Sequence, residues 1–158
     1  MRRVLELLII TGLMLSMAAC TGIKKKGEEG EVTTTESAMP TDESAALLET
    51  RVIYFDFDKS EVKSEFQDLI TAHAEYIAGH PDITVVLEGH ADERGTREYN
   101  IALGERRAKA VKQLLVLQGV AEKQLQVISF GEERPVALGH DESAWSLNRR
   151  VELLYSGE

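Results

Sequence analysis

The fold of this chain is decided by residues 52–89, which read VIYFDFDKSEVKSEFQDLITAHAEYIAGHPDITVVLEG. The opening run, Val52–Phe57, is rich in β-branched and aromatic residues and predicts a buried strand. Apolar residues then recur every three or four positions as far as Ile77, which predicts a helix that Gly79 ends. Every second residue of Ile83–Leu87 is apolar, and this alternation predicts a second strand.

The same kinds of pattern continue to the end of the chain. They predict a long helix over Glu98–Gln118, a strand over Leu125–Phe130, a turn-rich segment over Gly131–Ser146 and a last strand over Arg149–Tyr155. Strands separated by helices favour parallel neighbours, and a closing strand without a long crossover adds antiparallel pairing. The order βαβαββ therefore predicts an α/β (α+β) two-layer sandwich, with a mixed four-stranded sheet and helices packed on one face.

The N-terminal residues are typical of a targeting segment. Arg2 and Arg3 make it basic, and the apolar stretch Leu7–Met17 is too short to span a bilayer. Two alanines then precede Cys20, which is the only cysteine of the chain, so an intrachain disulfide is excluded. We expect residues 1–19 to be a signal peptide that is removed.

The run Leu15–Cys20 resembles a lipobox, which implies that Cys20 is acylated and becomes the first residue of a bacterial lipoprotein. Thr21, rather than an aspartate, follows the cysteine, and by the sorting habit of such lipoproteins this implies the outer membrane. Residues 20–50 are polar and charged with little to bury, and predict a flexible tether. A conventional signal peptide with an incidental cysteine is the alternative.

The remaining residues, 51–158, are predicted to form one globular domain, because 158 residues do not comfortably supply two. The formal net charge is −9 and the sequence pI is about 5.0. This charge excludes a broad attraction to nucleic acid, and the pair Arg149 and Arg150 is a poor electrostatic footprint for it.

The second predicted helix carries a cation in its apolar stripe. Arg107 lies four residues after Leu103, so both share one face, and a permanently charged side chain there needs a partner. The loop Gly89–Thr96 brings carboxylates, a further arginine and backbone amides to the start of this helix. Asp92 and Arg107 suit the ammonium and carboxylate of a zwitterionic ligand. Pairing of Asp92 with Arg107, to brace loop against helix, explains the residues equally well.

Four segments carry a resemblance to the OmpA-like peptidoglycan-binding domain, and it covers nearly all of residues 51–155. They are Tyr54–Asp58, Gly89–Gly95, Tyr99–Ala108 and Asn148–Glu152. The resemblance implies non-covalent binding of meso-diaminopimelate in peptidoglycan, with Asp92 and Arg107 on its ammonium and carboxylate. It also implies that the pocket is lined by Asp58, Glu93, Arg94, Thr96, Asn100 and Leu103. Ala91 departs from the pattern, since many relatives have threonine there.

Two further segments, Gly131–Pro135 and Leu138–Glu142, most resemble the lipid-anchored branch of that family. This implies an outer-membrane lipoprotein whose domain faces the periplasm, with peptidoglycan, TolB and other Tol proteins as partners. It further implies roles in envelope integrity and cell division. The competing hypothesis is a protein-interaction module of the envelope that does not bind the wall directly.

Enzymatic and metal chemistry are not predicted. Asp92 and Glu93 are adjacent in one loop and do not readily place two carboxyls across a glycosidic bond. No nucleophile elbow or phosphate loop occurs in the sequence. His90 and His140 lie near carboxylates but have no recognised zinc spacing. We expect that the protein is not an enzyme and that it binds no metal and no cofactor.

Overall fold

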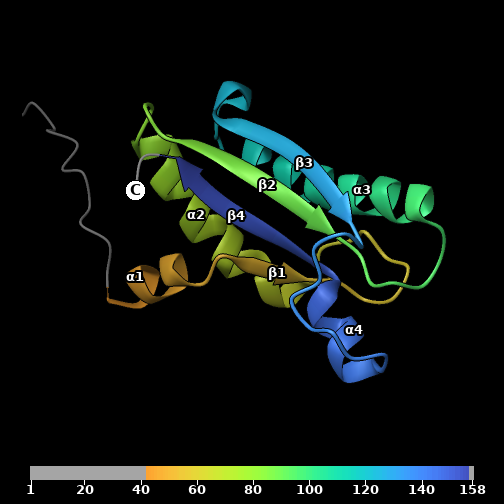
Figure 1. Ribbon diagram of the computed structural model, residues 1–158. Helices are drawn as coiled ribbons and strands as arrows, with labels where there is room; N and C mark the ends of the chain where they lie inside the picture. The colour runs from red at the N-terminus through yellow and green to blue at the C-terminus, as the bar shows by residue number, and fades with distance from the viewer. Residues whose placement is uncertain (1–41, 157–158) are drawn as a thin grey trace, which may run out of the picture. The chain divides into compact units, whose positions relative to one another are not determined.

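The structure is a computed structural model that describes residues 42–156 (Figure 1). The predicted signal peptide, Cys20 and most of the predicted tether lie outside these residues. The helices are α1 (Asp42–Glu49), α2 (Gln67–Gly79), α3 (Arg97–Leu117) and α4 (Glu142–Asn148), with short 3-10 turns η1 (Ser64–Phe66) and η2 (Glu122–Gln124). The strands are β1 (Val52–Tyr54), β2 (Thr84–His90), β3 (Leu125–Gly131) and β4 (Arg150–Ser156).

The four strands form one mixed sheet in the order β1-β4-β2-β3. β2 and β3 are parallel, whereas β4 runs antiparallel to both β1 and β2. Figure 1 shows β4 between β1 and β2, with α2 and α3 on one face of the sheet. The predicted fold class, a mixed four-stranded sheet with helices, is confirmed.

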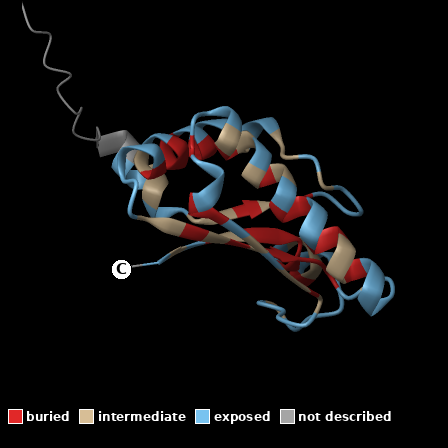
Figure 2. Ribbon diagram, turned by 90° about the horizontal axis from the view of Figure 1, so that it is seen from above, coloured by how far each residue is buried: buried red, intermediate tan, exposed pale blue. Residues whose placement is uncertain are grey.

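The core lies between the sheet and the two long helices, where the buried residues gather in Figure 2. β2 contributes Val85 and Leu87, and α3 contributes Val111 and Leu115, all of which are fully buried. Strand residues alternate between the two faces with a period of two, so one face of β2 is apolar and the other is partly exposed. None of the described helices is both long enough and apolar enough to cross a membrane.

The first strand is shorter than predicted. β1 ends at Tyr54, and the chain then turns through Asp56 to Lys59, whose backbone N–H donates to the carbonyl of Asp56 at 3.2 Å. Asp58 has a φ of 55°, which a strand does not allow. The turn leaves Phe57 exposed at the end of the sheet, although its aromatic ring favours a strand.

Two helices lie where none was predicted. α4 falls in the segment interpreted as turns, and Asp141 caps it by accepting a hydrogen bond from the N–H of Ala144 at 3.1 Å. α1 occupies the last part of the range expected to be tether, and its Leu47 packs against the core. A helix of one or two turns gives too few periodic positions to be recognised from sequence.

Candidate functional site

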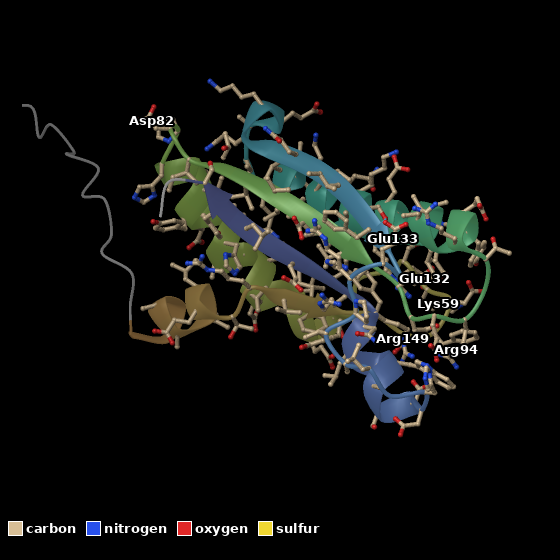
Figure 3. All side chains as sticks on the ribbon, in the orientation of Figure 1. Lys59, Asp82, Arg94, Glu132, Glu133 and Arg149 are labelled. Atoms are coloured by element: carbon tan, nitrogen blue, oxygen red, sulfur yellow. The ribbon has the colours of Figure 1, made fainter. Side chains whose placement is uncertain are left out.

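A small cavity lies at one end of the sheet, where the turn after β1, the loop between β2 and α3 and the start of α3 meet. Its volume is about 240 Å³, and it is lined by Phe57, Asp58, Asp92, Arg94, Gly95, Tyr99 and Leu103. Four of these, Asp58, Asp92, Arg94 and Leu103, are predicted pocket residues. The labelled Arg94 and Arg149 mark this end of the molecule beside α4 in Figure 3.

Asp92 is the buried anion of this cavity, with 4% of its surface exposed. Its Oδ1 accepts hydrogen bonds from the backbone N–H and the Nε of Arg94, both at 3.1 Å. Its Oδ2 accepts from Nη2 of Arg94 at 2.8 Å and from Nη1 of Arg149 at 3.3 Å. Burial raises the pKa of Asp92, but the hydrogen bonds from Arg94 and Arg149 outweigh it and hold the pKa below its usual value.

Arg94 forms part of the wall of the cavity. Its guanidinium lies against two aromatic rings, with Cζ 4.0 Å from the centroid of Phe57 and 4.1 Å from that of Trp145. Its edge makes the bidentate pair with Asp92, and Nη2 also lies 3.5 Å from Oε2 of Glu142. Aromatic faces attract a guanidinium while leaving its N–H edge available to anions.

Arg107 lies beneath the cavity and is fully buried, so it is not among the lining residues. Its guanidinium donates to three backbone carbonyls: Nε to Lys59 at 2.8 Å, Nη1 to His90 at 2.8 Å and Nη2 to Asp56 at 3.2 Å. A guanidinium has five N–H groups, so two remain beyond these three bonds. Burial lowers the pKa of Arg107 to about 10, and the side chain therefore stays charged at neutral pH.

The sequence left open whether Asp92 and Arg107 pair directly with each other, and the structure gives each of them other partners. Over residues 42–156 no hydrogen bond or ion pair joins these two side chains, since Asp92 pairs with Arg94 and Arg149. Arg107 instead braces the turn after β1 and the end of β2 through backbone carbonyls.

The other three predicted pocket residues do not line the cavity. Glu93 lines a different cavity together with His140, and it accepts from Nε1 of Trp145 at 2.9 Å and from Nδ1 of His140 at 2.8 Å. Thr96 caps α3 by accepting from the N–H of Tyr99 at 3.2 Å. Asn100 is buried and donates to the carboxylate of Glu132, while its Oδ1 has no partner among the described residues.

Several residues at the site were not predicted as ligand contacts. These are Phe57, Gly95 and Tyr99 in the lining, with Trp145 and Arg149 behind it. Arg149 is buried and also donates through Nε to the carbonyl of Phe55 at 3.0 Å. The signal available in the sequence was the paired arginines at the start of the last strand, because a buried arginine there needs anionic or carbonyl partners.

A metal site does not form around the histidines. Within residues 42–156 the structure brings no three His, Cys, Asp or Glu side chains together in a way that could hold a metal ion. His90 is buried, and burial with the charge of Arg150 lowers its pKa to about 4, so the ring is neutral. His140 is exposed and pairs with Glu93.

A second cavity, of about 440 Å³, lies along the C-terminal half of α3. It is lined by Lys109, Lys112, Gln113, Val116, Leu117 and Glu122. None of the predicted site residues is in this group, and its exposed surface is mostly apolar. Opposite fixed charges on buried residues occur at the smaller cavity, which is therefore the candidate site.

Comparison with known proteins identifies the family. Residues 54–149 match the model of the OmpA family, which is more than half of the chain. A peptidoglycan-associated lipoprotein of Pasteurella multocida is 42% identical over 98% of this chain and 100% of its own length. The chain belongs to the peptidoglycan-associated lipoproteins of the OmpA family.

Other members support the same assignment. The peptidoglycan-associated lipoprotein of Pseudomonas aeruginosa is 57% identical over 70% of this chain and 66% of its own length, so the chain spans slightly less than two thirds of that relative. The crystal structure of the peptidoglycan-associated lipoprotein from Burkholderia pseudomallei superposes with a TM-score of 0.69 and 49% identity. It covers 69% of this chain and 92% of the solved chain.

These matches confirm the predicted family and the coarse prediction of a peptidoglycan-associated envelope lipoprotein. Family membership also makes the chain a non-enzyme, in agreement with the prediction. The matched residues 54–149 include Asp58, Asp92 and Arg107, but the match does not assign a role to any of them.

Proposed function

We propose that this chain is an outer-membrane lipoprotein that binds peptidoglycan non-covalently through meso-diaminopimelate and thereby anchors the outer membrane to the cell wall. The observation that carries the proposal is the cavity at the end of the sheet, where the buried anion Asp92 lies among Arg94, Arg107 and Arg149. The relatives named peptidoglycan-associated lipoprotein support it.

Both charges of the ligand find partners at this cavity. The free amino-acid centre of meso-diaminopimelate carries one ammonium and one carboxylate. Asp92 takes the ammonium. Arg107 takes the carboxylate with the two N–H groups that the backbone does not use, once the lining residues that cover its buried guanidinium move aside. Charge-assisted hydrogen bonds of this kind contribute about 1.5–3 kcal/mol each.

The size of the cavity limits what enters it. A volume of about 240 Å³ is below the roughly 300–1,000 Å³ of sites that enclose a whole drug-sized ligand. It suits the end of one long side chain and not a disaccharide. The domain therefore recognises the end of the diaminopimelate side chain of the stem peptide, and Asp58, Tyr99 and Leu103 contact the methylene chain of that side chain.

The same chemistry predicts selectivity against lysine-type wall. A lysine side chain ends in an ammonium without the second carboxylate, so the guanidinium at the site gains no anion. A binding site left with unmatched buried polar groups discriminates strongly between ligands. Cross-linking that consumes the ammonium of diaminopimelate removes the partner of Asp92 in the same way.

The anchor and the protein partners complete the proposal. Acylation of Cys20 places several acyl chains in the outer membrane, which is enough for stable attachment. About 20 residues of tether lie between Cys20 and α1 and extend to about 75 Å at most, with the domain facing the periplasm. As part of the Tol-Pal system the chain acts with TolB and other Tol proteins in envelope integrity and cell division. The family resemblance supports these partners.

One observation favours the alternative, a protein-interaction module without direct wall binding. Asp92 and Arg107 are both engaged by groups of the fold itself, as structural braces are. The distinguishing experiment is a calorimetric titration of the full-length chain in detergent with a soluble muropeptide carrying uncross-linked meso-diaminopimelate, beside its lysine counterpart. Saturable binding of the first alone is expected, whereas binding of neither supports the alternative.

A pair of variants locates the site. Asp92→Asn keeps the shape of the side chain but removes its charge, and it lowers the affinity for the diaminopimelate muropeptide by at least about tenfold. Asp82→Asn is the matched control, because Asp82 is exposed at the opposite end of the sheet (Figure 3). Equal affinity of the Asp92→Asn variant and the parent contradicts the proposal.

A further inference from the structure

The anion of the site has no acceptor position left for a ligand. A carboxylate offers about four lone-pair positions. Asp92 fills them with the backbone N–H, Nε and Nη2 of Arg94 and with Nη1 of Arg149. An incoming ammonium therefore forms hydrogen bonds to Asp92 only where one of these donors leaves.

The donor that can leave is the guanidinium of Arg94. Arg149 is held by two further acceptors, the carbonyl of Phe55 and the carboxylate of Glu142, and its side chain is only 6% exposed. The backbone N–H of Arg94 is fixed by the loop. The guanidinium of Arg94, in contrast, lines the cavity, and its side chain is 31% exposed.

The aromatic rings around Arg94 allow such a movement. The ring centroids of Phe57 and Trp145 lie 4.0 and 4.1 Å from its Cζ. Stacking depends on the faces of the guanidinium and leaves its hydrogen-bonding edge free to change partner. Trp145 is itself held in place by the bond from its Nε1 to Glu93. The rings thus keep the cation at the cavity after it releases Asp92.

We propose that the ligand inserts into the Asp92–Arg94 ion pair. The ammonium takes the acceptor positions that Arg94 gives up on Asp92, and Arg94 moves onto the second oxygen of the ligand carboxylate, opposite Arg107. This inference rests on the proposed function and deepens it, because it makes Arg94 a specificity-determining residue. Only a ligand with both charges gives a new partner to both Asp92 and Arg94. A ligand with an ammonium alone leaves Arg94 without an anionic partner from the ligand.

Trp145 reports the movement directly, because it is the only tryptophan of the chain. The experiment titrates the full-length chain with the diaminopimelate muropeptide and follows tryptophan emission and heat in parallel. Tryptophan emission is expected to change, with the same midpoint as the calorimetric titration, since Arg94 shifts against the indole ring. Heat of binding without any change in emission overturns the inference and leaves the proposed function intact. Absence of heat contradicts the proposed function itself.

A variant tests the role of the charge. Arg94→Gln removes the cation that meets the carboxylate, and it lowers the affinity for the diaminopimelate muropeptide by about ten- to a hundredfold. Arg134→Gln is the matched control, because Arg134 also stacks on an aromatic ring, Phe130, and lies 3.8 Å from Glu88 outside the cavity. Equal or tighter binding by the Arg94→Gln variant overturns the inference. The emission of the parent chain decides the question even where this variant does not fold.

Discussion

The guanidinium of Arg107 donates a hydrogen bond from Nη1 to the backbone carbonyl of His90, 2.8 Å away, and both side chains are buried. The bond ties the middle of α3 to the end of β2, where the loop that carries Asp92 begins. Two further bonds from Arg107 hold the turn after β1. One side chain therefore positions two of the three segments that surround the cavity.

Replacement of Arg107 by alanine is expected to destabilise the fold by about 3 kcal/mol, because three carbonyls lose their donor and a cavity is left. Urea unfolding measures the free energy. Arg106→Ala on the exposed side of the same helix is the control and stays within about 0.5 kcal/mol of the parent. Equal stability of both variants contradicts the bracing role of Arg107.

Close approach of α3 to the sheet requires a glycine at position 104. A Cβ there would lie 2.8 Å from the carbonyl oxygen of Gly89 and 2.4 Å from Oγ of Ser129. Gly104→Ala is expected to cost about 1–3 kcal/mol of unfolding free energy, since backbone must move to admit the methyl group. Gly79→Ala is the control, because a Cβ at Gly79 meets nothing within 4 Å. Thermal unfolding of the two variants side by side tests the difference.

The free energy of unfolding is expected to decrease as the pH is lowered, because of His90. Its pKa is lowered from 6.5 to about 4 by burial and by Arg150, so the unfolded chain binds more protons than the folded chain between those values. The contribution is fully present above pH 6.5 and is lost as the pH falls towards 4, by on the order of 3 kcal/mol.

The His90→Gln variant isolates this contribution. Its unfolding free energy is expected to vary less between pH 7 and pH 4.5 than that of the parent. His73 remains in both proteins and provides a common background, since burial lowers its pKa as well. Parallel curves for parent and variant would exclude His90 as the source of the pH dependence.

The cap of α4 is expected to govern the order of Trp145. Asp141→Ala removes the acceptor for the N–H of Ala144 and costs about 1 kcal/mol of local helix stability, whereas Asp141→Asn keeps an acceptor. Fraying of α4 loosens the stack of Trp145 on Arg94. Tryptophan emission of the alanine variant should therefore become more solvent-like, with the asparagine variant close to the parent.

The sequence predicted the sheet and α3 because long periodic patterns report burial directly. It also singled out Arg107 as a cation in an apolar stripe that needs partners. The three partners of Arg107 are backbone carbonyls, two of them 48 and 51 positions away in the turn after β1, and no side-chain pattern marks a carbonyl as an acceptor.

The rest of the site depends on contacts between distant segments. Arg149 bonds to Asp92, 57 residues away in the sequence. Arg94 contacts Trp145, which lies in α4, a helix of only 7 residues. Neither the pairing nor the short helix has a periodic signal. The placement of Glu93 away from the cavity likewise depends on the loop conformation, since adjacent residues of a loop can face opposite sides.

β1 has a mechanical consequence. It joins Thr50, where the N-terminal part of the chain leaves the sheet, to Phe57 and Asp58 in the wall of the cavity. Under the proposed anchoring, a pull between the membrane and the wall enters the domain through α1, whose Leu47 packs against the core, and then passes along this strand. Its bonds to β4, from Val52↔Glu152 to Tyr54↔Arg150, are loaded together in shear instead of being peeled apart singly. The strand has only three residues, but the tension runs along its axis, the direction in which its pairs with β4 must break together.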